Sequence, residues 1–215
     1  MMFTMASSPG SGSEASRIAA QLRADIVDGV RAPGSKLVER DVAAAMGVSR
    51  VPVRDALKIL VAEGLVTLRP RTWAVVREFS EREVADLFEA REALDSLAFR
   101  LATSRRTPEG MERLRSAVDT ETRAAEAGDV RTARRLAADF HELVIELAGN
   151  TVLTELAETT RSRMRWLLSQ HDDVQDVARQ HAGLCDAIAA GDHLLVVRLA
   201  AEHLAHSREM QRNFI

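Results

Sequence analysis

The sequence predicts a mainly α-helical protein, in which a small N-terminal unit of helices and a β-hairpin precedes an antiparallel bundle of about six helices. Aromatic residues make up only 4% of the 215 residues and tyrosine is absent, which favours helices packed with Leu, Ala, Val and Ile. Apolar residues recur at helical spacing over most of the chain. Short breaks rich in Gly, Pro and Asp separate these stretches, and connections this short favour antiparallel neighbours.

Composition divides the chain into a flexible tail over 1–13, a first domain over 14–79 and a second domain over 80–215. The tail is rich in Ser, Gly and Pro. The first domain carries 11 Lys and Arg against 8 Asp and Glu, and the second carries 18 against 24. The first domain can therefore approach phosphate groups, whereas the second would be repelled by them. Neither a membrane span nor a signal peptide is recognisable, so we expect a soluble cytoplasmic protein.

The sequence of the first domain predicts three helices and a β-hairpin. The first helix should cover 16–30, because an apolar ladder of Ile18, Leu22, Ile26 and Val30 runs along it. Two further helices are expected over 37–46 and 49–63, and Gly47 between them can adopt the left-handed conformation that ends a helix. Ser49 is expected to cap the third helix by accepting an amide hydrogen bond. Beyond the glycine that stops this helix, the hairpin is predicted from residues 65–68 and 73–76.

The helix over 49–63 has two different faces. Its apolar stripe consists of Val53, Leu57, Leu60 and Val61. Arg50, Arg54 and Lys58 lie on another face, nearest the start of the helix. Spaced arginines are often only a solvated face, but here they follow a helix, a glycine turn and a serine. This order favours a helix that enters the major groove of DNA.

The same residues resemble a known family. LVER at residues 37–40, GVSRVPVRDAL at 47–57 and EGLV at 63–66 resemble the winged helix-turn-helix signature of the GntR superfamily of bacterial transcription regulators. The helical remainder resembles the FCD effector domain of the FadR-like subfamily. The resemblance implies DNA-facing positions for these residues: Arg40, Ser49, Arg50, Val51 and Arg54.

Physical chemistry suggests how these DNA-facing residues act. Arg50 or Arg54 can donate two hydrogen bonds to guanine, and Arg40 and the Ser49 hydroxyl suit phosphate. Asp55 would repel phosphate, so we expect it to orient Arg54 or Arg40.

The predicted wing departs from the family pattern. It lacks the usual glycine, since Thr72 and Trp73 stand there, which predicts a wider or mobile tip. Arg69 and Arg71 remain candidates for phosphate contacts.

The second domain reads as six consecutive helices. Their expected ranges are 80–105, 108–127, 129–148, 151–170, 174–190 and 192–212. Ser80 and Glu83 predict a capping box at the start of the first. Cys185, the sole cysteine, lies in an apolar helical pattern and is expected to be a core residue.

Three histidines in this domain lie beside apolar helical patterns: His141, His181 and His203. A single helical histidine is usually a surface or half-buried residue. Many FCD domains, however, hold a divalent metal through three histidines and an aspartate four residues before the first, and the three histidines match those positions. Ala137 stands where that aspartate would be, and Asp139 points to another face of the helix. The resemblance therefore implies a three-imidazole site for zinc or nickel, with one place left for water or an effector carboxylate.

Arg91 matches an arginine that often faces the effector cavity in this domain, and its planar fork suits a carboxylate. An ion pair along the helix with Asp95, four residues later, is an equally good interpretation.

Taken together, these features predict a sequence-specific transcription regulator, most often a repressor in this family, controlled by a small carboxylate effector. We expect a homodimer that binds a palindromic double-stranded operator, because one module contacts too little DNA for tight binding. Two alternatives remain at this point. One is a metal-dependent enzyme that uses the three-histidine site, and the other is a purely structural helical protein.

Overall fold

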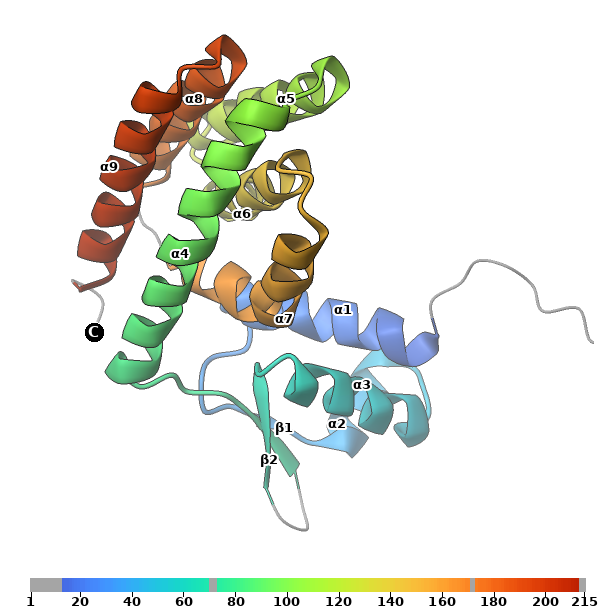
Figure 1. The fold of residues 1–215 in the computed structure, drawn as a ribbon. Helices are drawn as coiled ribbons and strands as arrows, with labels where there is room; N and C mark the ends of the chain where they lie inside the picture. Colours follow the sequence, from blue (N-terminus) through green and yellow to red (C-terminus); the bar gives the residue numbers. More distant parts are fainter. Residues whose placement is uncertain (1–12, 70–72, 171–172, 213–215) are drawn as a thin grey trace, which may run out of the picture. The chain divides into compact units, whose positions relative to one another are not determined.

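The computed structural model describes residues 13–69, 73–170 and 173–212. These form two compact units, Met1–Arg77 and Glu78–Ile215. The elements of the first unit are α1 (Glu14–Val27), β1 (Lys36–Leu37), α2 (Glu39–Met46), α3 (Arg50–Ala62), β2 (Val66–Arg69) and β3 (Trp73–Val76) (Figure 1). The strands form an antiparallel sheet in the order β1-β3-β2. The predicted hairpin is thus extended by one further strand.

Strand β1 corrects the predicted start of the second helix. Leu37 pairs with Ala74 of β3 in the sheet, and its side chain is fully buried. The helix begins only at Glu39. A strand of two residues is too short to show an alternating pattern, so the sequence could not reveal it.

The core of the first unit lies between α1 and α3. Ile18, Leu22 and Ile26 of α1 are buried, as are Val53 and Leu60 of α3. The predicted ladder on α1 is therefore correct except at its end. The helix stops at Val27, and Val30 is 62% exposed. Burying α3 along one stripe leaves its opposite face in solvent.

The second unit is the predicted bundle. Its helices are α4 (Glu81–Arg105), α5 (Pro108–Glu126), α6 (Val130–Leu147), α7 (Thr151–Leu168), α8 (Val174–Ala190) and α9 (His193–Arg212). The capping box is present, because the Ser80 hydroxyl accepts from the Glu83 amide while the Glu83 carboxylate accepts from the Ser80 amide. α4 packs against α9, α6 and α7, and α5 packs against α6 and α8 (Figure 1).

The bundle core holds large apolar side chains from most of these helices. Phe99, Phe140, Leu184 and Ile188 are almost completely buried. Cys185 is also buried, as expected for a core residue. Along the described part of the chain, every helix is too short or too polar to cross a membrane.

Candidate functional site

Gly47 and Ser49 lie in the short connection between α2 and α3. Gly47 ends α2 in the left-handed conformation, with φ at 66°, as its position predicted. Ser49 is the N-cap residue of α3, but its side chain accepts no capping hydrogen bond. The expected cap is therefore wrong. An N-cap side chain bonds the amides at the second or third helical position, and the third is Pro52, which has no N–H.

The residues that were predicted from the sequence to contact DNA lie on exposed parts of this unit. Arg50, Val51 and Arg54 are all exposed on the first turns of α3, and Arg40 is exposed on α2. The Val51 side chain is 65% exposed, on the face of α3 opposite its buried stripe. The structure therefore brings two cations and one apolar side chain together at the leading end of α3.

Glu39 of α2 holds both arginines of this surface. Its two carboxylate oxygens lie 2.9 Å from Nε and Nη2 of Arg54, and one lies 3.5 Å from Nη2 of Arg50. The hydrogen bonds from Arg54 hold the pKa of Glu39 below its usual value. All three side chains remain in contact with solvent. Another anion can therefore replace the Glu39 carboxylate beside these arginines at low cost in free energy.

The expected role of Asp55 is wrong. Asp55 pairs with Lys58 at 2.8 Å, and Arg40 pairs with the adjacent Asp41 at 3.0 Å. The hydrogen bonds of Arg54 go to Glu39 instead. Glu39 was the orienting carboxylate, and no local spacing could have identified it.

Of the two wing arginines, Arg69 is exposed at the end of β2. It pairs with Trp73 in the sheet register. Arg71 and the predicted wide tip lie outside the described residues, as does the rest of 70–72.

In the second unit, the three predicted histidines meet inside the bundle. His141 comes from α6, His181 from α8 and His203 from α9, and at most 6% of any of them is exposed. One ring nitrogen of each lies within 4.8 Å of the others. The sequence named these residues from the family resemblance, since nothing in the spacing alone brings three helices together.

An oxygen of a further polar side chain lies beside Nδ1 of each imidazole. His203 Nδ1 lies 2.7 Å from the amide oxygen of Gln180, and His141 Nδ1 lies 3.1 Å from Asp95. His181 Nδ1 lies 2.9 Å from both carboxyl oxygens of Glu121. Sequence reasoning missed Glu121 and Gln180, because polar residues on helices give no sign that they are turned inward.

Burial favours the uncharged form of His141, His181 and Glu121. It lowers the pKa of His181 to about 3 and, opposed by Asp95, the pKa of His141 to about 4. Burial also raises the pKa of Glu121 to about 8. Burial alone would raise the pKa of Asp95 as well. The neighbouring His141 and Arg91 outweigh burial, so the pKa of this carboxyl lies below its usual value. Neutral imidazoles are the form that binds a metal ion.

Arg91 of α4 reaches the same point and is only 3% exposed. Its Nε donates to Asp95 at 3.1 Å, and Nη1 donates to Ser207. Its Nη2 lies 3.1 Å from Nε2 of both His141 and His203. The ion pair with Asp95, one of the two interpretations of Arg91, is therefore present. Because a guanidinium nitrogen can only donate, both rings present the Nε2 lone pair to it.

The donor set suits a divalent metal. Two Nε2 lone pairs point to one centre, and the Nε2 atom of His181 is buried with no hydrogen-bond partner in the described part of the chain. An oxygen beside each Nδ1 is also typical of metal-binding histidines. Ala137 is buried without offering a ligand. Asp139 pairs with Arg165 and does not replace the missing ligand, which agrees with its expected place on another face of the helix.

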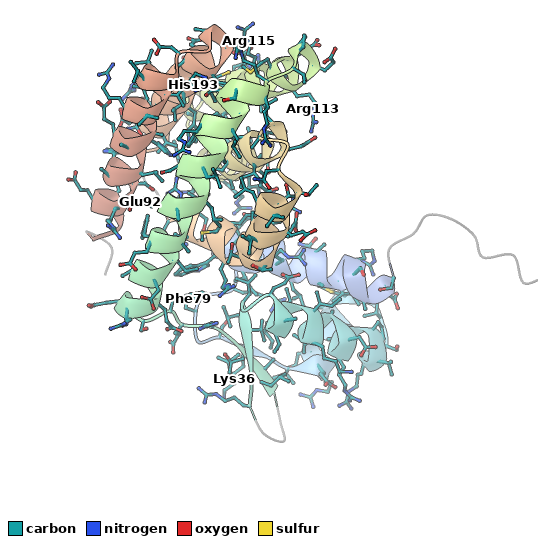
Figure 2. The ribbon with its side chains drawn as sticks, viewed as in Figure 1. Lys36, Phe79, Glu92, Arg113, Arg115 and His193 are labelled. Carbon is teal, nitrogen blue, oxygen red and sulfur yellow. The ribbon has the colours of Figure 1, made fainter. Side chains whose placement is uncertain are left out.

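A cavity of about 590 Å³ adjoins the cluster between α4, α5, α6 and α7. Arg91, Asp95 and His141 form part of its lining. Three more arginines line it, each paired with an acidic residue: Arg113 with Glu146, Arg161 with Glu142, and Arg165 with Glu142 and Asp139. Arg113 is labelled on α5 in Figure 2. The volume suits a small organic molecule.

Comparisons with known proteins agree with this architecture. The family described as "Bacterial regulatory proteins, gntR family" matches residues 14–76, and the FCD domain matches residues 86–206. A probable D-xylose utilization operon transcriptional repressor of Paenarthrobacter nicotinovorans is 28% identical over 184 residues, covering 84% of this chain and 81% of that protein. An HTH-type transcriptional regulator of Mycobacterium tuberculosis is 32% identical over 199 residues, covering 82% and 80%.

A solved structure shows the same fold. E. coli McbR/YncC superposes with a TM-score of 0.83 at 21% sequence identity, covering 95% of this chain and all of that one. The family and the two relatives similar in sequence are DNA-binding transcriptional regulators, so the enzyme alternative is not supported. The exposed helix α3 and the cavity in the helical bundle thus belong to a GntR-family transcriptional regulator with a C-terminal FCD domain.

Proposed function

We propose that this regulator is a homodimeric repressor that binds a palindromic operator and is released from it by a small carboxylate. The cavity beside the histidine cluster carries this proposal, because its volume suits a small molecule and the three neighbouring histidines could hold a cation that attracts an anion. The relative from Paenarthrobacter is named a repressor of an operon for sugar utilization, which supports control by a small metabolite. Such a protein acts on chromosomal DNA, hence in the cytoplasm.

On the DNA side, we assign base contacts to Arg50 and Arg54, since an arginine can bind guanine O6 and N7 with two hydrogen bonds. The exposed Val51 side chain suits a thymine methyl group. We assign phosphate contacts to Arg40, Ser49, Arg69 and Arg71. The Ser49 hydroxyl is not used as a helix cap, which supports a contact outside the protein.

On the effector side, the lining of the cavity holds four arginines and five acidic residues. These charges nearly cancel, so a carboxylate gains little net attraction from the lining alone. A divalent ion held by His141, His181 and His203 would add two positive charges and a place for a carboxylate oxygen. We therefore propose zinc or nickel as the cofactor, with the carboxylate bound beside it and within reach of Arg91.

The test has two parts. The mass of the protein in solution, measured by light scattering, should be twice the 23.6 kDa of one chain. An operator should be selected from a random duplex library, and small mono- and dicarboxylates should be screened by thermal shift with and without zinc.

A carboxylate that stabilises the protein should also release the operator at fixed salt, and its uncharged amide should do neither. A monomer, or equal effects of the acid and its amide, would contradict the proposal.

A further inference from the structure

The guanidinium of Arg91 occupies the point where the histidine rings meet. Its Nη2 atom is 3.1 Å from Nε2 of His141 and 3.1 Å from Nε2 of His203. One NH2 group has two hydrogens, so it can satisfy both lone pairs at once. Because the side chain is 3% exposed, water does not compete for these bonds.

A metal ion would need the same two lone pairs. Metal–nitrogen distances in such sites are about 2.1 Å, which leaves no room for a guanidinium nitrogen bonded to the same atoms. A divalent cation and a guanidinium this close in a buried site would also repel each other strongly. The ion and Arg91 cannot therefore both bind His141 and His203.

The structure offers the side chain another position. Arg91 also lines the cavity of about 590 Å³ beside the cluster. Its Nε bond to Asp95, one helical turn away, can persist while the NH2 groups leave Ser207 and the two histidines and turn toward the cavity. There they would meet a bound anion with two free donors, which is the arrangement that an arginine needs to bind a carboxylate.

We propose that Arg91 is an internal competitor for the divalent metal, and that metal binding turns its guanidinium out of the histidine cluster into the effector cavity. This inference rests on the metal site of the proposed function. It assigns one donor, Nη2 of Arg91, to the two ring nitrogens that the ion would bind. It also makes the ion and an anionic effector bind cooperatively, since the ion releases the arginine that the effector uses.

The test is the affinity of full-length protein for zinc, measured by competition with a fluorescent chelator after removal of bound metal. Arg91→Met should bind zinc at least tenfold more tightly than the wild type, because the competitor is gone. Arg113→Met removes another cation from the same cavity, at a side chain that is 57% exposed, and should leave the zinc affinity unchanged. Since Arg91→Met takes the guanidinium partner from the buried Asp95, Arg91→Gln, which keeps a side-chain amide beside it, provides a second variant with the same expectation.

The outcomes separate this inference from the metal site itself. Equal zinc affinity in the wild type and both Arg91 variants would overturn the inference and leave the metal site standing. Absence of zinc binding in all of them would overturn both. A structure of the zinc-loaded wild type gives an independent readout. The guanidinium in the cavity would support the inference, and the guanidinium still between His141 and His203 would contradict it.

Discussion

One arginine in each domain shows how differently this protein uses the same side chain. Arg54 on α3 is 54% exposed and is bonded to the carboxylate of Glu39. Arg91 on α4 is almost fully buried and is bonded to Asp95, Ser207 and two histidines. The first ion pair faces solvent, and the second is closed inside the bundle.

The difference lies in what can replace each partner. Water and counterions can take the place of Glu39 at Arg54 with little loss, so a base edge or a phosphate can do so as well. At Arg91, any partner that leaves must be replaced at once, because an unpaired charge in a buried site is costly. The exposed arginine is therefore suited to reversible recognition, and the buried one to a switch between two satisfied states.

Removing Asp95, the buried carboxylate partner of Arg91, should have the largest effect on stability. Asp95→Ala leaves Arg91 buried without its carboxylate, which should lower the free energy of unfolding by about 3–5 kcal/mol. Urea unfolding followed by circular dichroism measures this. Glu146→Ala removes the partner of the exposed Arg113 and should leave the urea concentration at the midpoint of unfolding unchanged. Similar midpoints for the two variants would mean that burial does not distinguish the two kinds of pair.

The buried cluster should also respond to pH. Glu121 has a pKa of about 8 in the folded protein, above the ordinary value of 4.5. Its contribution to stability is complete below about pH 4.5 and is lost as the pH rises to about 8. Glu121→Gln cannot ionise, so its melting temperature should exceed that of the wild type by roughly 5 °C or more at pH 8, and the difference should vanish near pH 5.

Glu109 provides the control for this pH effect, because it lies on the same helix with an exposed side chain. Glu109→Gln should show no difference at either pH. A difference for Glu121→Gln that is the same at pH 5 and pH 8 would rule out a raised pKa as its cause.

The smallest effect is expected at Glu39. Glu39→Gln removes a negative charge that competes with DNA for Arg50 and Arg54, so binding to a scrambled duplex should strengthen a few-fold. Binding to the operator should gain less, because the arginines lose the group that orients them. The ratio of the two affinities, measured by fluorescence anisotropy, should therefore fall. A ratio that rises would show that Glu39 only obstructs binding.

Much of the fold could be predicted from the sequence because its helices are long, periodic and clearly capped. The six helices of the bundle and the order of helices around Gly47 were predicted from such signals. β1 was missed because two residues carry no periodicity. The expected Ser49 cap is not formed, and one of the two amides that it could bond is missing because proline stands three residues along the chain.

The site was less predictable because it is assembled from distant parts of the chain. The family resemblance named His141, His181 and His203, but the residues beside them come from α4, α5 and α8: Asp95, Glu121 and Gln180. Only packing decides which polar side chains of a helix turn inward. For the same reason, Asp55 was expected to hold Arg54, whereas Glu39, fifteen residues away, does so.

The most direct test of this account is the affinity of Arg54→Ala for the selected operator at fixed salt, with Arg198→Ala on α9 as an exposed control. The account predicts a loss of roughly tenfold to a hundredfold for Arg54→Ala, with no loss for Arg198→Ala and an unchanged melting temperature for both. An operator affinity equal to that of the wild type would contradict the assignment of α3 as the helix that reads DNA.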